Sequence, residues 1–183
     1  MESTYIRKKS LIVTAVDYKK AFDSIKREEI IKTLMKYKVN QKIIDTVANI
    51  YYEDYTTIRL GEDDEVTTKI TNGIKQGCTG STTLFKLITY MIMTELEEKG
   101  RGFENDEIKL NSLYFADDGL ILSTTLEDTR RNIQLVIEIS EKYGLELNKE
   151  KSNIIMYNVK NQPEELENIQ VRSRRNKIFT SND

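Results

Sequence analysis

The sequence of 183 residues contains no histidine and only one cysteine, Cys78. An internal disulfide needs two cysteines, and a serine-type catalytic triad or a histidine-ligated zinc site needs histidine, so the chain can form none of these. Low cysteine content is typical of a reducing, intracellular compartment. We therefore expect the protein in the nucleus or the cytoplasm.

Long hydrophobic runs and an excess of one charge are also missing. No apolar stretch approaches the roughly 20 residues that cross a bilayer, and residues 1–10 are polar and basic without an apolar core. Basic and acidic residues nearly balance, with 28 Lys and Arg against 30 Asp and Glu, so the net charge by itself indicates no nucleic-acid partner. We expect no membrane partner for this chain.

Proline occurs once, and it marks the candidate domain boundary. Pro163 stands where an apolar-patterned region gives way to an acidic segment, residues 164–167 (EELE). The 38% hydrophobic content is enough for one compact domain with a sizeable core. The sequence thus predicts a folded domain over residues 1–160 and a polar tail over residues 161–183.

An acidic turn is the most distinctive motif that the sequence does contain. Residues 113–122 (LYFADDGLIL) set two adjacent carboxylates, Asp117 and Asp118, between two apolar runs of strand-like composition. This pattern predicts strand, tight turn, strand, with the acids and the following Gly119 forming the turn. A solvated turn that only reverses the chain is the alternative for this motif on its own.

A third carboxylate, Asp17, ends an apolar strand of β-branched composition, residues 11–16 (LIVTAV). Strands that end in aspartate can lie side by side in one sheet even when they are far apart in sequence, which would bring the three carboxylates together. Clustered carboxylates are commonly neutralised by divalent cations, and oxygen-only ligand sets favour Mg²⁺ or Mn²⁺. Two such ions can activate a hydroxyl and stabilise leaving oxygens in phosphoryl transfer.

Four segments in order resemble the palm motifs of reverse transcriptases, most closely those of non-LTR (LINE-like) retrotransposons. They are residues 17–23 (DYKKAFD), 73–81 (GIKQGCTGS), 115–118 (FADD) and 144–152 (GLELNKEKS). The resemblance covers about residues 11–157 and implies an α+β fold, a palm-like antiparallel sheet with helices packed on one face. It also implies an RNA-directed DNA polymerase that joins a dNTP to the 3′-hydroxyl of a DNA primer on an RNA template.

The resemblance assigns roles to single residues around two Mg²⁺ or Mn²⁺ ions. Asp17 and Asp117 correspond to the leading metal ligands, Asp118 assists more indirectly, and Tyr18 offers its backbone carbonyl to a metal. Lys151 corresponds to the lysine proposed to protonate the leaving pyrophosphate, which makes it a candidate general acid. From its position in the sequence alone, Lys151 is an ordinary surface lysine.

Two features that could contact a nucleotide also have structural interpretations. Phe22, near a strand end, is most simply a core residue, but the resemblance places its ring under the sugar of the incoming nucleotide, where it would collide with a 2′-hydroxyl. Residues 72–81 form a glycine-rich loop before a predicted helix, and such a loop is more often structural than ligand-binding. With Gln76 and Gly77 in place, the resemblance implies a loop that packs against the templating base and the incoming nucleotide.

Hydrophobic periodicity predicts the remaining elements. They are helices over residues 26–37 and 43–51, a hairpin over 55–60 and 66–71, a long helix over 84–96, a helix that starts with a capping box at 125–128 and closes at 144, and a strand over 154–157. Helix N-caps are expected at Asn40, at Ser81 or Thr82, and at Asp23.

The resemblance begins only at the first aspartate motif, so the fingers region that precedes it in the family is expected to be missing and the thumb absent or degenerate. The missing regions, or a longer polyprotein, are therefore expected partners. The basic residues 172–177 (RSRRNK) are most simply a solvated tail. Residues 79, 80 and 82 (T, G and T) differ from the proline-containing pattern usual in the family.

Two other functions are compatible with parts of the sequence. One is a truncated retroelement remnant that binds a nucleic acid or a protein without catalysis. The other is a palm-fold nucleotide cyclase or another metal-dependent phosphotransferase, for which two glycines before the acid pair would have been typical. Phe115 and Ala116 stand there instead.

Overall fold

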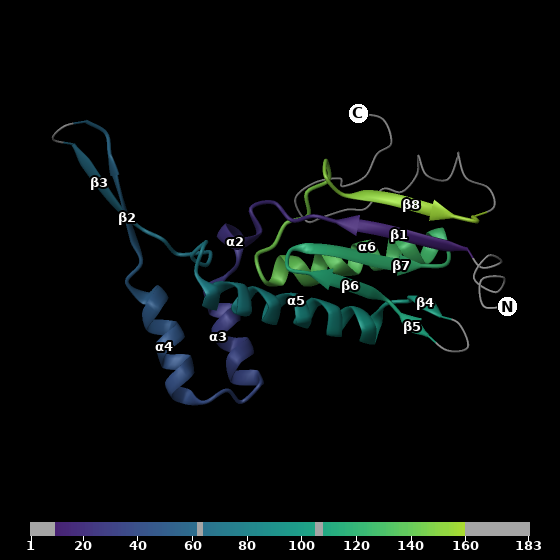
Figure 1. Cartoon of the computed structure of the whole chain (residues 1–183), viewed down its shortest axis with the longest axis horizontal. Helices are drawn as coiled ribbons and strands as arrows, with labels where there is room; N and C mark the ends of the chain where they lie inside the picture. The colour runs from purple at the N-terminus through teal and green to yellow at the C-terminus, as the bar shows by residue number, and fades with distance from the viewer. Residues whose placement is uncertain (1–9, 62–63, 105–107, 160–183) are drawn as a thin grey trace.

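The computed structural model describes residues 10–61, 64–104 and 108–159. Its centre is a four-stranded antiparallel sheet in the order β6-β7-β1-β8 (Figure 1). The strands are β1 (Leu11–Val16), β6 (Ser112–Phe115), β7 (Asp118–Ser123) and β8 (Asn153–Tyr157). The predicted α+β fold with a palm-like antiparallel sheet is confirmed.

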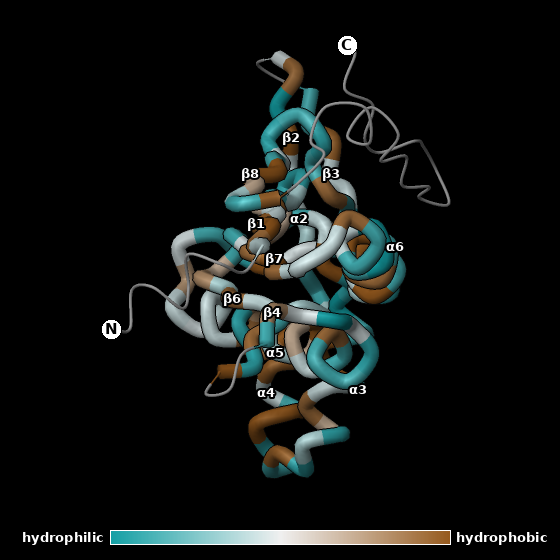
Figure 2. Tube along the Cα trace, turned by 90° about the vertical axis from the view of Figure 1, so that its right-hand side faces the viewer, coloured by the Kyte–Doolittle hydropathy of each residue, from teal (hydrophilic) through white to brown (hydrophobic). Residues whose placement is uncertain are grey.

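Two long helices, α5 (Thr79–Lys99) and α6 (Leu126–Lys142), cover one face of this sheet. Figure 2 shows α6 to one side of the strands. Alternate residues of β1 are buried against the helices, as the two-residue period of a strand requires. The core between the layers includes the fully buried side chains Ile12, Phe85, Ile88, Ile92, Ile121 and Ile133.

A smaller group of elements lies beyond one end of the sheet (Figure 1). It consists of α2 (Ala21–Ser24), α3 (Arg27–Lys36), α4 (Gln41–Tyr52) and the antiparallel hairpin of β2 (Tyr55–Arg59) and β3 (Glu65–Lys69). Asn40 caps α4 as predicted, because its side chain accepts a hydrogen bond from the Lys42 amide at 3.0 Å. The hairpin projects away from the helices, and nearly all of its residues are exposed.

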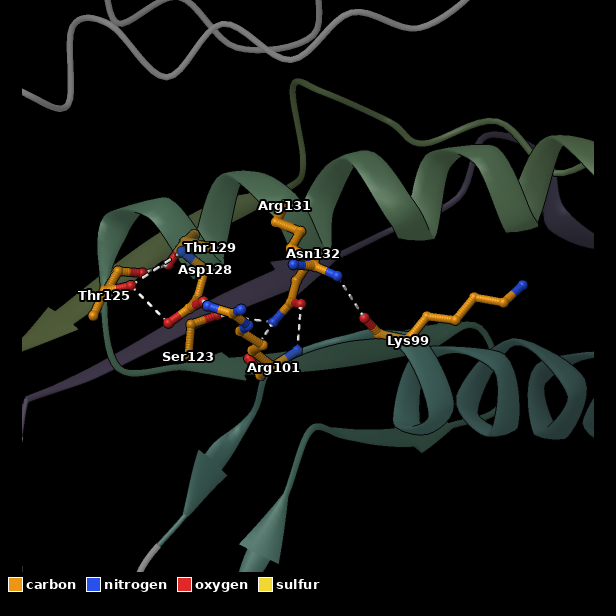
Figure 3. Close-up of polar contacts among 8 residues, drawn as sticks. All are labelled: Lys99, Arg101, Ser123, Thr125, Asp128, Thr129, Arg131 and Asn132. Atoms are coloured by element: carbon orange, nitrogen blue, oxygen red, sulfur yellow. Dashed lines mark hydrogen bonds and ion pairs between the residues drawn. The ribbon is translucent and has the colours of Figure 1, made fainter.

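The start of α6 is held to the end of α5 by a polar network (Figure 3). Thr125 caps α6 by accepting a hydrogen bond from the Asp128 amide at 3.1 Å, as the predicted capping box requires. The fully buried Asn132 accepts from the Arg101 amide at 3.0 Å and donates to the Arg101 carbonyl at 2.7 Å. A short hairpin of β4 (Phe103–Glu104) and β5 (Lys109–Leu110), absent from the sequence prediction, follows this network.

The acidic turn differs from the prediction in its position. The turn residues are Ala116 and Asp117, and Asp118 is already the first residue of β7, opposite Phe115. Ala116, with φ of 54°, adopts the left-handed conformation that glycine most readily takes. Gly119 lies inside β7, where an added Cβ would come within 2.5 Å of the side chains of Tyr114 and Val16.

Two predicted helix caps are wrong. Helix α5 begins at Thr79, with Cys78 in the N-cap position. Ser81 is buried instead, and its hydroxyl lies 3.2 Å from that of Tyr51. Asp23 lies within α2, and its carboxylate accepts a hydrogen bond from Gln76. In both cases a partner distant in sequence takes the side chain that would otherwise cap a helix.

Several predictions concern residues outside the described part of the chain. These are the boundary at Pro163, the basic segment 172–177 and the tail over 161–183. Among the described residues, no helix is both long enough and apolar enough to span a bilayer.

Thr14 offers a test of the packing between sheet and helices. Its side chain is fully buried in β1, and its hydroxyl has no hydrogen-bond partner among the described residues. We expect Thr14→Val to raise the free energy of unfolding by about 1 kcal/mol, because valine removes an unsatisfied buried hydroxyl at similar volume. The measurement is urea denaturation.

The matched control is Thr33→Val. Thr33 is also buried, but its hydroxyl donates to the Glu29 carbonyl at 2.6 Å. This substitution removes a hydrogen bond that the protein does make, so it should lower stability or leave it unchanged. Equal effects of the two substitutions would contradict the assignment of an unsatisfied hydroxyl in β1.

Candidate active site

The three predicted aspartates lie at the same end of the sheet. Strand β1 ends at Val16, which pairs with Gly119, so Asp17 emerges where β7 begins at Asp118. Asp117 occupies the turn immediately before β7. The two-residue alternation puts Asp17 and Asp118 on the face of the sheet opposite α5 and α6. The tertiary structure thus brings Asp17 and the adjacent pair Asp117 and Asp118, which are distant in sequence, to one end of the two central strands.

In the described part of the chain, none of the carboxylates of these three aspartates makes an ion pair or accepts a hydrogen bond. No group of three or more His, Cys, Asp or Glu side chains among the described residues could by itself hold a metal ion. Such a cage is not required, because Mg²⁺ keeps several waters and is usually bound by one or two carboxylates together with substrate phosphates. The oxygen-only donor set of Asp17 and Asp117 fits that chemistry.

Hydrogen-bonded hydroxyl groups connect the segment of Asp17 and the acidic turn on the side of the sheet that faces α6. Tyr18, next to Asp17, has its hydroxyl 3.3 Å from that of Tyr114 and 3.0 Å from that of Ser140 in α6. Burial raises the pKa of the Tyr18 hydroxyl and raises that of Tyr114 well above its ordinary value. Both phenols therefore stay neutral, and they anchor the acidic turn and the end of β1 on the same helix.

The segment before β8 holds the backbone around Asp17. The Asp17 carbonyl accepts from the Asn148 amide at 2.8 Å, and the Asp17 amide donates to the Ser152 hydroxyl at 3.2 Å. The backbone carbonyl of Tyr18 accepts no hydrogen bond from the described residues.

Lys151 lies between Asn148 and Ser152, the two residues whose hydrogen bonds hold the Asp17 peptide groups. Its exposed ammonium group has no partner among the described residues. It lines a broad hollow of 1280 Å³ that also touches Tyr18, Lys20 and Asp23, but not the aspartates of the sheet edge. Lys151 thus lies in the segment that holds the backbone of Asp17, and its role stays a prediction.

The glycine-rich loop lies directly on α2. Gly73 donates to the Ile25 carbonyl at 2.7 Å, and Ile74 donates to the Phe22 carbonyl at 2.8 Å. Gly73 has φ of 82°, and an added Cβ would meet the Asp23 carbonyl oxygen at 2.7 Å. Only glycine permits this close contact between the two backbones.

The residues with predicted nucleotide contacts lie where the glycine-rich loop meets α2. The half-buried ring of Phe22 stacks on Phe85, with centroids 4.7 Å apart and planes 10° from parallel. Gln76 is exposed and donates to the Asp23 carboxylate at 2.9 Å. Gly77 has φ of 79° and open space where a side chain would stand. The ring is thus fixed by packing, while Gln76 and Gly77 face solvent.

A family model described as "Reverse transcriptase (RNA-dependent DNA polymerase)" matches residues 1–175. The chain belongs to the reverse transcriptase family. The resemblance predicted from four short motifs is therefore confirmed over almost the whole sequence.

Curated relatives of this reverse transcriptase domain are Pol polyproteins of type-1 retrotransposable element R2. The chain is 27% identical over 147 residues to one from Popillia japonica, covering 80% of this chain and 24% of the relative. It is 27% identical over 148 residues to one from Bradysia coprophila, covering 81% and 17% respectively. The domain thus spans about a quarter or less of the length of these relatives.

Solved structures of telomerase share the fold. Apo telomerase from Candida tropicalis, truncated from its C-terminal domain, superimposes with a TM-score of 0.65 at 19% identity. The match covers 87% of this chain and 33% of the telomerase chain. The arrangement of sheet and helices is therefore one that this telomerase also adopts.

Two residues that contact the glycine-rich loop, Arg27 and Asp54, could not be identified from the sequence. Arg27, the first residue of α3, donates to the Gly73 carbonyl at 2.7 Å and forms an ion pair with Asp54 at 2.6 Å. In sequence Arg27 looks like a surface residue of an amphipathic helix, and Asp54 like part of a polar connection. A buried pair 27 residues apart has no periodicity by which it could be found.

The contact between the glycine-rich loop and α2 can be tested with two matched glycines. Gly73 and Gly77 have nearly the same positive φ, but only Gly73 touches backbone. We expect Gly77→Ala to cost roughly 1–2 kcal/mol from the left-handed conformation alone. Gly73→Ala should cost roughly 1–3 kcal/mol more, because its methyl group overlaps the Asp23 backbone. Urea denaturation of both variants measures the difference, and equal losses would contradict the close contact.

Proposed function

We propose that this reverse transcriptase domain is the palm of an RNA-directed DNA polymerase that joins a dNTP to the 3′-hydroxyl of a DNA primer. The observation that carries the proposal is a set of three carboxylates at one end of the sheet that have no partner among the described residues, those of Asp17, Asp117 and Asp118. Each lies in a backbone segment that hydrogen bonds hold in place, while its side chain is left free for a ligand.

Asp17 and Asp117 would be the ligands of two Mg²⁺ or Mn²⁺ ions, with the free Tyr18 carbonyl as a further oxygen donor. Asp118, exposed at the start of β7, would act more indirectly through its charge. When bound, the ions would lower the pKa of the primer hydroxyl and stabilise the charge on the leaving pyrophosphate. Substrate phosphates and water would complete the metal coordination, as is usual for Mg²⁺.

Phe22, Gln76 and Gly77 would form the nucleotide side of the site. A ring that excludes a 2′-hydroxyl must be rigid, and the stacking of Phe22 on buried Phe85 supplies that rigidity. Gln76 and Gly77 are exposed on a loop that is pinned to the same short helix. Lys151, whose ammonium group is free and exposed, would donate a proton to the pyrophosphate.

The remaining partners follow from the length of the relatives. The R2 Pol polyproteins are at least four times as long as the matched region, so we propose that fingers and thumb segments of a longer protein complete the polymerase. An RNA template, a DNA primer and a dNTP would be its substrates. An intracellular location, nuclear or cytoplasmic, accords with this chemistry.

Metal binding can be tested without any polymerase activity. We expect wild-type protein to bind Mn²⁺ weakly in calorimetry, and the double variant Asp17→Ala, Asp117→Ala to lose this binding, because only these two carboxylates are proposed as ligands. The double variant Glu53→Ala, Asp64→Ala removes the same charge near the hairpin and is the control. Equal Mn²⁺ binding by all three proteins would remove the two-metal assignment.

Polymerase activity is expected only with additional segments. Correct positioning of reactants can contribute roughly 7–11 kcal/mol to lowering a barrier, and phosphoryl transfer depends mainly on positioning and charge stabilisation. The 183-residue chain should therefore extend a primer on an RNA template poorly or not at all. A fusion that adds fingers and thumb segments from an R2 relative should extend it.

The control in this assay is the same fusion with Asp117→Asn, which should be at least about a hundredfold slower, a loss comparable with removal of one preorganised charge-stabilising group. Robust extension by the bare chain would contradict the need for added segments. A fusion no faster than its Asp117→Asn version would instead indicate a remnant that binds without catalysis.

A further inference from the structure

Arg27 is the most extensively bonded side chain of the region between the hairpin and the sheet. Its side chain is only 12% exposed. The guanidinium donates to the carbonyls of Gly73 at 2.7 Å, Ile70 at 2.6 Å and Tyr51 at 3.1 Å, and to the Asp54 carboxylate at 2.6 Å. It thereby joins the end of α4, both strand ends at the base of the hairpin, and the glycine-rich loop.

These contacts require the shape of arginine. Four acceptors surround the guanidinium, and its plane also lies over the Tyr51 ring at 4.8 Å. A lysine carries three donors on a single nitrogen, so it cannot reach acceptors spread around a planar fork. The site therefore depends on geometry as well as on charge.

Asp54 forms ion pairs with Arg27 and with Lys75 of the glycine-rich loop. Its side chain is 11% exposed, and its other carboxylate oxygen lies 3.4 Å from the Lys75 ammonium. Burial alone would raise the pKa of Asp54, but the hydrogen bond from Arg27 and the charge of Lys75 outweigh it, so the pKa lies below its ordinary value. The backbone carbonyl of Asp54 also accepts from the Ile70 amide at 2.8 Å.

Arg27 and α2 hold the same glycine from opposite sides. The Gly73 carbonyl accepts from Arg27, while its amide donates to Ile25. The next amide, that of Ile74, donates to the Phe22 carbonyl. The distance between the exposed Gln76 and the Phe22 ring is therefore set by a backbone segment that cannot shift unless the Arg27 contacts break.

We propose that Arg27, held by Asp54, is a positioning residue that fixes the glycine-rich loop on α2 and couples the loop to the base of the β2–β3 hairpin. A nucleotide held between Phe22 and Gln76 depends on this coupling, and that part of the inference rests on the proposed function. The mechanical part does not, because it concerns only the attachment of the loop.

Hydrogen exchange of single amides, measured by NMR on the full chain, shows whether Arg27 fixes the glycine-rich loop or stabilises the whole fold. In Arg27→Lys, we expect the Gly73 and Ile74 amides to exchange about tenfold to a hundredfold faster, the loss expected for a hydrogen bond to a charged group. The amides of β1 should change much less. If all amides speed up equally, Arg27 only stabilises the fold and the proposal is wrong.

If Arg27→Lys does not fold, the exchange experiment can be done with a variant of the partner residue, which perturbs the contact less. Asp54→Asn preserves the shape of the partner and removes its charge, and it should speed exchange at the same two amides by a smaller factor. The matched control is Arg59→Lys, in an exposed pair with Glu65 at the far end of the hairpin. Faster exchange at Gly73 in that control, or none in Asp54→Asn, would overturn the coupling through Asp54.

A second readout links the coupling to the nucleotide. In the fusion with R2 fingers and thumb segments, Asp54→Asn should raise KM for the dNTP more than it lowers kcat, because the loop positions substrate and supplies no reacting group. Altered exchange with an unchanged KM would confine Arg27 to loop attachment and reject its role in nucleotide binding. An inactive wild-type fusion would reject the proposed function and leave the exchange result standing.

Discussion

The antiparallel register of β1 against β7 is the constraint on which the site depends. Val16 pairs with Gly119, so the end of one strand meets the start of the other, and Asp17 comes to the edge where the acidic turn lies. A slip of one residue would turn every side chain of β1 to the opposite face and direct Asp17 into the helices. Gly119 secures the register, because Tyr114 and Val16 occupy the space of its missing side chain.

The hydrogen bonds around Asp17 and the acidic turn fix backbone groups and tyrosine hydroxyls, and none of those among the described residues involves the three carboxylates. Asn148 and Ser152 bind the peptide groups of Asp17 from one side, and the Tyr18 and Tyr114 hydroxyls join the two acidic segments from beneath. Carboxylates gathered at one end of a sheet repel one another. A cation bound there would relieve that repulsion, which is the physical reason for the metal-dependent chemistry that we propose.

Much of this domain was predictable because its determinants are local. The 3.6-residue periodicity identified α3, α4, α5 and α6, and the side chains of Asn40 and Thr125 cap helices within three residues of their own positions. Short motifs around Asp17 and Asp117 were enough to identify the family, since strand composition and polar turn residues are properties of contiguous sequence. The site residues stay predictions where only function would test them, as for Lys151 and Phe22.

The tertiary structure decided what depends on partners distant in sequence. Ser81 was expected to cap a helix, but its hydroxyl lies beside Tyr51, and Asp23 binds Gln76 instead of capping. The Arg27 contacts were beyond prediction, because three of its four acceptors are backbone groups, which every residue possesses. Sequence determined which residue types lie at strand ends and in turns through local propensity. Only the packing of α2, the hairpin and the glycine-rich loop determined which of them meet, since such contacts depend on the positions of whole elements.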